Sequence, residues 1–286
     1  AYYAFTLEEI ERQIEAPTGE IDGMCLELVG KVVDDEEYLQ RLKIPQAYWP
    51  LISDSWHSDE FSLYGRLDLC FDGSHPAKLL EYNADTPTSI FESAVFQWTW
   101  LEQAIERAII PKRADQFNSI HEKLIAAWQG YGIEGTVHFT SVGPGLPAYV
   151  EDRGTADYMR DTAHQAGLAT KVLDIEKIGW NGSRFDDGDG ETISTLWKLY
   201  PWEWLVAEEY GKLIPQSRCL FIEPAWKMLL ANKWSTGTSK NPWIWSACRS
   251  IVMMRSTPAA VSMLATNLAP MLTRGLSLRS CRAKPK

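Results

Sequence analysis

The stretch that decides the fold is residues 64–92, which read YGRLDLCFDGSHPAKLLEYNADTPTSIFE. Two runs rich in apolar residues flank a turn at residues 72–76, and this pattern predicts a β-hairpin. Side chains of a strand alternate between its two faces, so residues two apart lie on the same side. Arg66 and Asp68 therefore share one face of the first strand, and Glu81 and Asn83 share one face of the second.

A register that brings these two faces together would gather a guanidinium, two carboxylates and an amide on one patch of sheet. Carboxylate and amide oxygens suit a hard cation such as Mg²⁺, and the fork of an arginine holds an anion. Solvent-facing ion pairs, which contribute a few tenths of a kcal/mol, are the alternative. Residues 83–89 favour a ligand-binding site over such ion pairs. Short polar side chains there precede a helical run, and the first amides of a helix attract anions.

Several motifs together resemble a known family. LEYNADTPTS at 80–89, with Arg66-Leu67-Asp68 upstream, resembles the synthetase domain of the glutathionylspermidine synthase family and its stand-alone bacterial relatives. Members are ATP-grasp ligases, with a pre-ATP-grasp part, that activate a carboxylate as an acyl phosphate and couple it to an amine. The resemblance covers about residues 1–233 and implies a mixed α/β fold and an ATP-dependent C–N ligase. Its further matches are AYYAFTL at 1–7, YPWEW at 200–204 and FIEPAWKMLL at 221–230 with Asn232-Lys233.

The resemblance also implies roles for the four polar residues of the hairpin. Asp68, Glu81 and Asn83 would bind Mg²⁺. Arg66 would contact ATP and stabilise the reacting phosphate, which makes it the expected catalytic residue.

Substrate contacts are implied in the same way. Thr86 and Thr88 would contact a small carboxylate substrate similar to glutathione. Glu151 and Asp152 are the nearest match to the acidic pair that binds a polyamine-like amine. Lys233 corresponds to a lysine that reaches the nucleotide phosphates, and a position at a solvated helix end is its alternative.

The charge of the chain changes abruptly near its C-terminal end. All 38 acidic residues and 20 of the 28 basic ones lie in residues 1–233, so that part carries a formal charge of −18, whereas residues 234–286 carry +8. Three interpretations compete: a basic extension that docks on an acidic surface or nucleic acid, a diverged part of the fold, and an altered reading frame after Lys233. The third is expected, because the resemblance stops there and nothing in the basic segment matches the family's ATP-binding lobe.

Two rival functions stand beside the ligase, and an altered frame favours the first of them. The chain is then a truncated or frame-altered, catalytically inactive fragment that only binds a substrate or a partner. An adaptor that works through its basic segment is the other alternative.

Composition restricts the partners and the compartment. A net charge of −10 argues against nucleic acid as a partner. No apolar run approaches the roughly 20 residues of a membrane span, and the first residues lack signal-peptide character. Five cysteines without CxxC spacing predict free thiols, hence a cytoplasmic protein. The five histidines show no zinc-like spacing.

The pattern along the chain predicts four segments. Residues 1–110 form an ATP-grasp-like core with the hairpin, 111–215 a small α/β subdomain, 216–233 the start of an ATP-binding lobe that stays incomplete, and 234–286 an anomalous basic tail. Strand, helix and strand at 136–175 predict a crossover unit with a parallel pair.

Local signals add three expectations. A capping box at Thr6 and Glu9 opens a helix that ends near Ala16, where Pro17 interrupts it. The acidic turn at 186–189 lacks calcium-loop spacing and is expected to be a solvated hairpin turn. Six tryptophans are expected to be core or interface anchors: Trp98, Trp100, Trp202, Trp204, Trp226 and Trp234.

Overall fold

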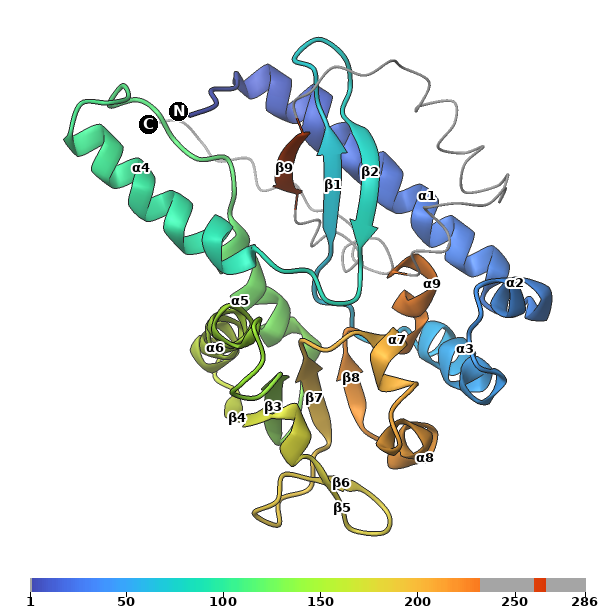
Figure 1. Ribbon diagram of the computed structural model, residues 1–286. Helices are drawn as coiled ribbons and strands as arrows, with labels where there is room; N and C mark the ends of the chain where they lie inside the picture. The colour runs from blue at the N-terminus through green and yellow to red at the C-terminus, as the bar shows by residue number, and fades with distance from the viewer. Residues whose placement is uncertain (1, 232–259, 266–286) are drawn as a thin grey trace.

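The computed structural model describes residues 2–231 and 260–265 (Figure 1). β1 (Arg66–Cys70) and β2 (Lys78–Asn83) form the predicted antiparallel hairpin. Arg66 pairs with Asn83 and Asp68 with Glu81, so the four polar residues do share one face. β9 (Ala260–Ala265) pairs antiparallel with the other edge of β1. On the opposite face of β1, Leu67 and Leu69 are buried in an apolar cluster with residues of the first helix.

The chain begins with one continuous helical segment, a π-helical turn η1 (Glu9–Glu15) followed by α1 (Ala16–Val32). The predicted capping box is confirmed, since Thr6 N donates to Glu9 Oε2 at 2.6 Å and Glu9 N donates to Thr6 Oγ1 at 3.2 Å. The expected interruption at Pro17 is wrong. Pro17 is the second residue of α1 and lies inside the continuous segment, where the wider π register of the preceding turn accommodates its missing N–H.

A four-stranded parallel sheet lies below the hairpin in Figure 1, in the order β4-β3-β7-β8. α6 (Tyr149–Gln165) connects β3 to β4, and the two strands pair in parallel, so the predicted crossover is confirmed. The strands are short and mostly apolar, as expected for a parallel sheet covered on both faces. Their bounds are Thr136–Ser141 for β3, Ala169–Asp174 for β4, Thr195–Lys198 for β7 and Leu220–Ile222 for β8.

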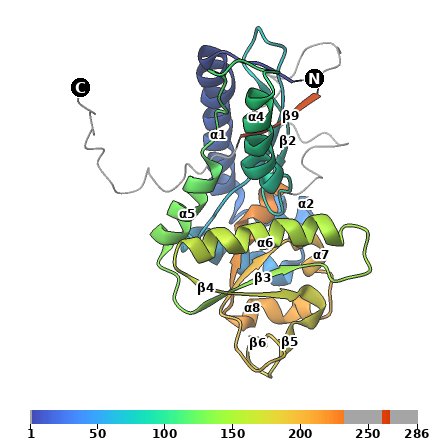
Figure 2. The same ribbon diagram turned by 90° about the vertical axis from the view of Figure 1, so that its left-hand side faces the viewer.

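Helices cover both faces of this sheet (Figures 1 and 2). On one face α5 (Ile120–Tyr131) and α6 enclose a core that contains Phe139 and Trp197. On the other face a second core contains Leu196 and Phe221. Residues of several helices contribute to it, among them α3 (Trp49–His57), α7 (Trp202–Leu205) and α8 (Ile214–Ser217). The mixed α/β class is therefore confirmed.

The remaining elements connect these two parts. β5 (Gly179–Trp180) and β6 (Phe185–Asp186) form a small hairpin at the end of the parallel sheet that is remote from β1 and β2 (Figure 1). No helix within the described ranges has both the length and the apolar character that crossing a membrane requires. The helical elements whose bounds have not yet been given are α2 (Glu36–Arg41), η2 (Gln46–Tyr48), η3 (Glu92–Phe96), α4 (Gln97–Glu106), η4 (Ile175–Lys177), η5 (Tyr210–Leu213), η6 (Ala225–Lys227) and α9 (Met228–Ala231).

The tryptophans divide into two groups. Trp202 and Trp226 are buried as expected. Trp98, Trp100 and Trp204 are 43%, 46% and 54% exposed, so a place in the core is wrong for these three and a role as interface anchors stays a prediction. α4 contributes buried Leu101 and Ala104 to a small apolar cluster of its own, so its other faces meet solvent.

Part of the sequence-based division of the chain falls outside the structure. Trp234 and, apart from β9, the basic tail at 234–286 lie outside the described residues. The four segment boundaries remain a prediction. β8 belongs to the predicted third segment and β7 to the predicted second, and the two strands pair in one sheet.

Candidate functional site

The polar face of the β1–β2 hairpin brings the predicted metal and phosphate residues together. Arg66 donates to both oxygens of Asp68, from Nε to Oδ1 at 2.8 Å and from Nη2 to Oδ2 at 3.2 Å. Asn83 Nδ2 donates to Asp68 Oδ2 at 3.2 Å, and Glu81 lies directly opposite Asp68 in the register. The side chains of Arg66 and Asp68 are only 16% and 21% exposed. This pair is thus more shielded than the solvent-facing ion pairs that were the alternative.

The loop after β2 extends this face. Arg66 Nη1 donates to the hydroxyl of Thr88 at 3.2 Å and to its carbonyl oxygen at 3.3 Å. One arginine therefore holds both the β1 carboxylate and the loop. Ser89, at the end of the loop, has a left-handed backbone with φ of 69°, and a helical segment begins at the next residue.

Thr86, in the same loop, lines a pocket of about 460 Å³, a size typical of sites for small molecules. Asn83 and Asp85 line it from the same side. The facing walls come from residues 42–45 and from residues 201–204, the latter being part of the YPWEW match. The hairpin face and the pocket thus share Asn83 and the loop that follows it.

A buried ion pair that the sequence did not reveal fixes this loop. The carboxylate of Asp85 contacts Lys198 Nζ through Oδ1 and accepts from Trp202 N through Oδ2 at 2.6 Å. The Lys198 side chain has no exposed area, and Asp85 is 5% exposed. Burial lowers the pKa of Lys198, and the neighbouring Asp85 opposes that shift. The signal in the sequence was a lone lysine within the apolar strand at 195–199.

A second buried pair fixes the start of β1. Glu223 accepts from the backbone N–H groups of Leu63 and Tyr64 at 3.0 and 3.1 Å, and Lys227 Nζ donates to Glu223 at 2.6 Å. Burial raises the pKa of Glu223, and the ammonium of Lys227 opposes that shift. Lys227 also donates to the carbonyl oxygen of Tyr64 at 2.6 Å, so this ammonium has two hydrogen-bond acceptors in the protein interior.

The remaining predicted residues lie elsewhere. Glu151 and Asp152 occupy the first turn of α6, and neither lines the pocket. Burial, followed by the charge of Glu151, raises the pKa of Asp152. Lys233 lies outside the described residues.

The donor set of the hairpin face fits a magnesium ion. Two carboxylates and an amide stand on neighbouring strands, in adjacent pairs of one register, and Mg²⁺ prefers such oxygen ligands. With one guanidinium against two carboxylates, the face keeps a formal charge of −1, which favours a cation.

Comparison with known proteins gives the same picture as the motifs. A Haemophilus influenzae protein named provisionally as an acid–amine ligase is 42% identical over 233 residues, which are 81% of this chain and 58% of that protein. The bifunctional glutathionylspermidine synthetase/amidase of Escherichia coli is 28% identical over 208 residues, which are 71% of this chain and 31% of that protein. The chain thus spans less than two thirds of the length of these relatives.

One solved structure shares the fold. It is a glutathione synthetase-like effector from Globodera pallida, with a TM-score of 0.51 and 12% identity, and the match covers 84% of this chain and 60% of that one. The family described as glutathionylspermidine synthase preATP-grasp matches residues 1–235, most of the chain. The chain therefore belongs to the glutathionylspermidine synthase pre-ATP-grasp family.

Proposed function

We propose that this chain carries the metal and phosphate face of an ATP-dependent ligase that joins a carboxylate to an amine. The observation that supports it best is the shielded group of Arg66, Asp68 and Thr88 beside a pocket of about 460 Å³. The names of the two relatives, an acid–amine ligase and a glutathionylspermidine synthetase/amidase, support the same reaction class.

In this proposal the residues of the hairpin have separate roles. Asp68, Glu81 and Asn83 hold Mg²⁺, which when bound neutralises the charge of the phosphate oxygens. Arg66 stabilises the phosphoryl group on its way from ATP to the substrate carboxylate. The amine nitrogen then attacks the carbonyl carbon of the acyl phosphate, so that the C–N bond forms as the C–O bond to phosphate breaks. Inorganic phosphate leaves and the nitrogen releases a proton. Because Asp68 and Thr88 both accept from Arg66, the guanidinium is held in place before substrate arrives.

The substrates of the proposal follow from the family. Thr86 and Thr88 contact a glutathione-like carboxylate, and the position of Thr86 on the pocket wall supports this. Glu151 and Asp152 receive a polyamine-like amine, and Lys233 contacts the ATP phosphates. The proposed setting is the cytoplasm, which the free thiols of Cys70 and Cys219 support.

A second candidate function is substrate or partner binding without catalysis. The pocket of about 460 Å³ supports it, because a pocket of this size can bind a small molecule without turning it over.

ADP formation separates the two functions. The 286-residue chain is incubated with ATP, Mg²⁺, glutathione and spermidine, and ADP is followed beside Asp68→Ala. The ligase predicts ADP release that needs both substrates and that Asp68→Ala loses. ADP release that Asp68→Ala retains would contradict the assignment of the hairpin. A well-folded chain that binds glutathione but releases no ADP would establish the second function instead.

A further inference from the structure

His138 is a buried histidine whose ring has no hydrogen-bond partner among the residues that the structure describes. It lies on β3 between Val137 and Phe139, which face the core with α5 and α6, so its own side chain points to the other face of the sheet. The side chain is fully buried, and neither Nδ1 nor Nε2 makes a hydrogen bond within residues 2–231. A buried polar group without a hydrogen-bond partner is destabilising, so this ring requires an explanation.

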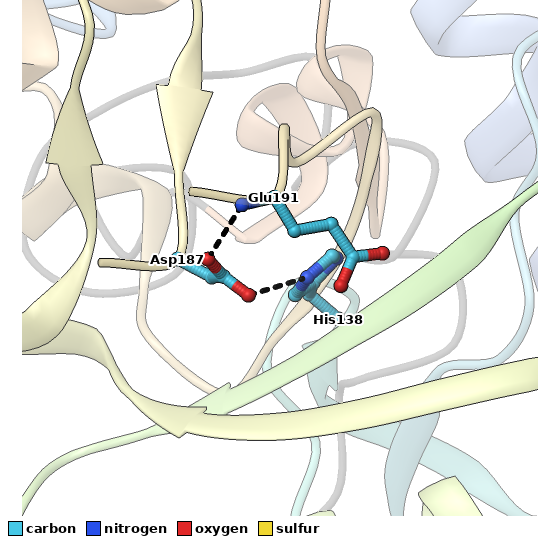
Figure 3. A group of neighbouring side chains, drawn as sticks. All are labelled: His138, Asp187 and Glu191. Carbon is cyan, nitrogen blue, oxygen red and sulfur yellow. Dashed lines mark hydrogen bonds and ion pairs between the residues drawn. The ribbon is translucent and has the colours of Figure 1, made fainter. Parts of the chain in front are cut away.

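Two carboxylates from the turn between β6 and β7 lie over this imidazole (Figure 3). Asp187, whose side chain has no exposed area, places Oδ2 3.7 Å from His138 Nε2. That distance is too long for a hydrogen bond and leaves room for an atom bound to both. Glu191 is exposed, and its carboxylate lies beside the same ring in Figure 3. One ligand atom from each of the three residues lies within 4.8 Å of the other two.

Hydrogen bonds within the turn orient the carboxylate of Asp187. Asp187 Oδ1 accepts from the backbone N–H groups of Asp189 and Glu191 at 2.9 and 3.0 Å. Its other oxygen, Oδ2, faces His138 and contacts the ammonium of Lys171, the residue that pairs with His138 on β4. Lys171 also donates to Asp189 at 3.0 Å. Its ammonium therefore keeps one carboxylate partner if its contact with Asp187 is broken.

We propose that His138, Asp187 and Glu191 form a binding site for a divalent transition metal of the Zn²⁺ type. An imidazole with two carboxylates is a ligand set that suits zinc, whereas Mg²⁺ and Ca²⁺ prefer oxygen ligands alone. The three acidic groups at the turn outweigh the single ammonium of Lys171, which favours a cation. A bound ion would satisfy His138 and fasten the turn at residues 187–191 to the sheet. The site is remote from the β1–β2 hairpin and does not depend on the proposed ligase activity.

Zinc titration of the whole chain, followed by calorimetry, tests this proposal. We expect one saturable Zn²⁺ site and a rise in the melting temperature on binding. Glu191→Gln, at an exposed position that leaves the fold intact, should weaken binding by about tenfold or more. Lys171→Met should tighten binding, because the ammonium no longer competes for Asp187 Oδ2.

Two control variants complete the design. His164→Ala removes an exposed imidazole outside the cluster, and Asp72→Asn removes an exposed carboxylate of the β1–β2 turn; both should titrate as the unmodified chain does. The proposal is overturned if the chain takes up no Zn²⁺ saturably. It is equally overturned if Glu191→Gln and Lys171→Met both bind Zn²⁺ with unchanged affinity.

Discussion

Asp85 and Lys198 form a buried ion pair that joins the loop after β2 to the last residue of β7. The residue before Asp85 is buried as well, and the residue after it lines the pocket. Asp85 thus connects the hairpin, with its proposed metal ligands, to the parallel sheet. The position of the candidate site therefore depends on charges in the interior as much as on the hairpin register.

Lys198→Met should be strongly destabilising, because it leaves the buried carboxylate of Asp85 with only the Trp202 N–H as a partner. The expected loss is about 3–5 kcal/mol in the free energy of unfolding, measured with urea. The double variant Asp85→Asn with Lys198→Met should recover part of that loss, since neither position then carries a buried charge. A loss below about 1 kcal/mol for Lys198→Met would show that Asp85 finds other compensation.

Two glycines provide a matched test of the packing. A Cβ on Gly211 would lie 2.1 Å from the carbonyl oxygen of Leu205, a backbone atom that cannot move aside cheaply. Gly211→Ala should therefore lower the melting temperature markedly. A Cβ on Gly23, within α1, meets nothing within 4 Å. Gly23→Ala should be neutral or stabilise by up to about 1 kcal/mol, because alanine favours the helix. Equal melting temperatures for the two variants would contradict this packing.

Stability at acid pH should respond to Asp72 in the β1–β2 turn. The backbone N–H of Ser74, and then His75, lower the pKa of Asp72 to about 2. Because the folded-state pKa is below the ordinary value, this carboxylate stabilises the fold above about pH 4 and loses that effect as the pH falls toward 2. The unmodified chain should therefore melt above Asp72→Asn near pH 6, and the gap should narrow by about pH 3. A gap that stays constant over this range would contradict the assignment.

The hairpin and its polar face were predictable from sequence because they depend on local spacing. A period of two fixes which side chains share a face, and the turn at 72–76 fixes which strands meet. The crossover at β3, α6 and β4 was predictable for the same reason. Pro17 was misjudged because the π-helical turn that precedes it leaves no mark in the residue pattern.

The interior charges were not predictable, because their partners are distant in sequence. Lys198 pairs with a residue 113 positions away, and Tyr64 accepts from Lys227 across 163 positions. Spacing rules cannot register such contacts, which depend on how the loop and the sheet pack. For the same reason the sequence did not predict the role of His138 in the proposed zinc site. Its carboxylate neighbours come from the turn near residues 186–189, which was expected to be solvated.

Calorimetric titration with ATP and Mg²⁺, beside Asp68→Ala and the turn variant Asp72→Asn, tests the central proposal most directly. The hairpin site predicts saturable binding by the 286-residue chain and by Asp72→Asn, and its loss in an Asp68→Ala variant that still melts cooperatively. Undiminished binding by Asp68→Ala would contradict the assignment of the metal and phosphate face to this hairpin. Absence of binding by the cooperatively folded unmodified chain would contradict it as well.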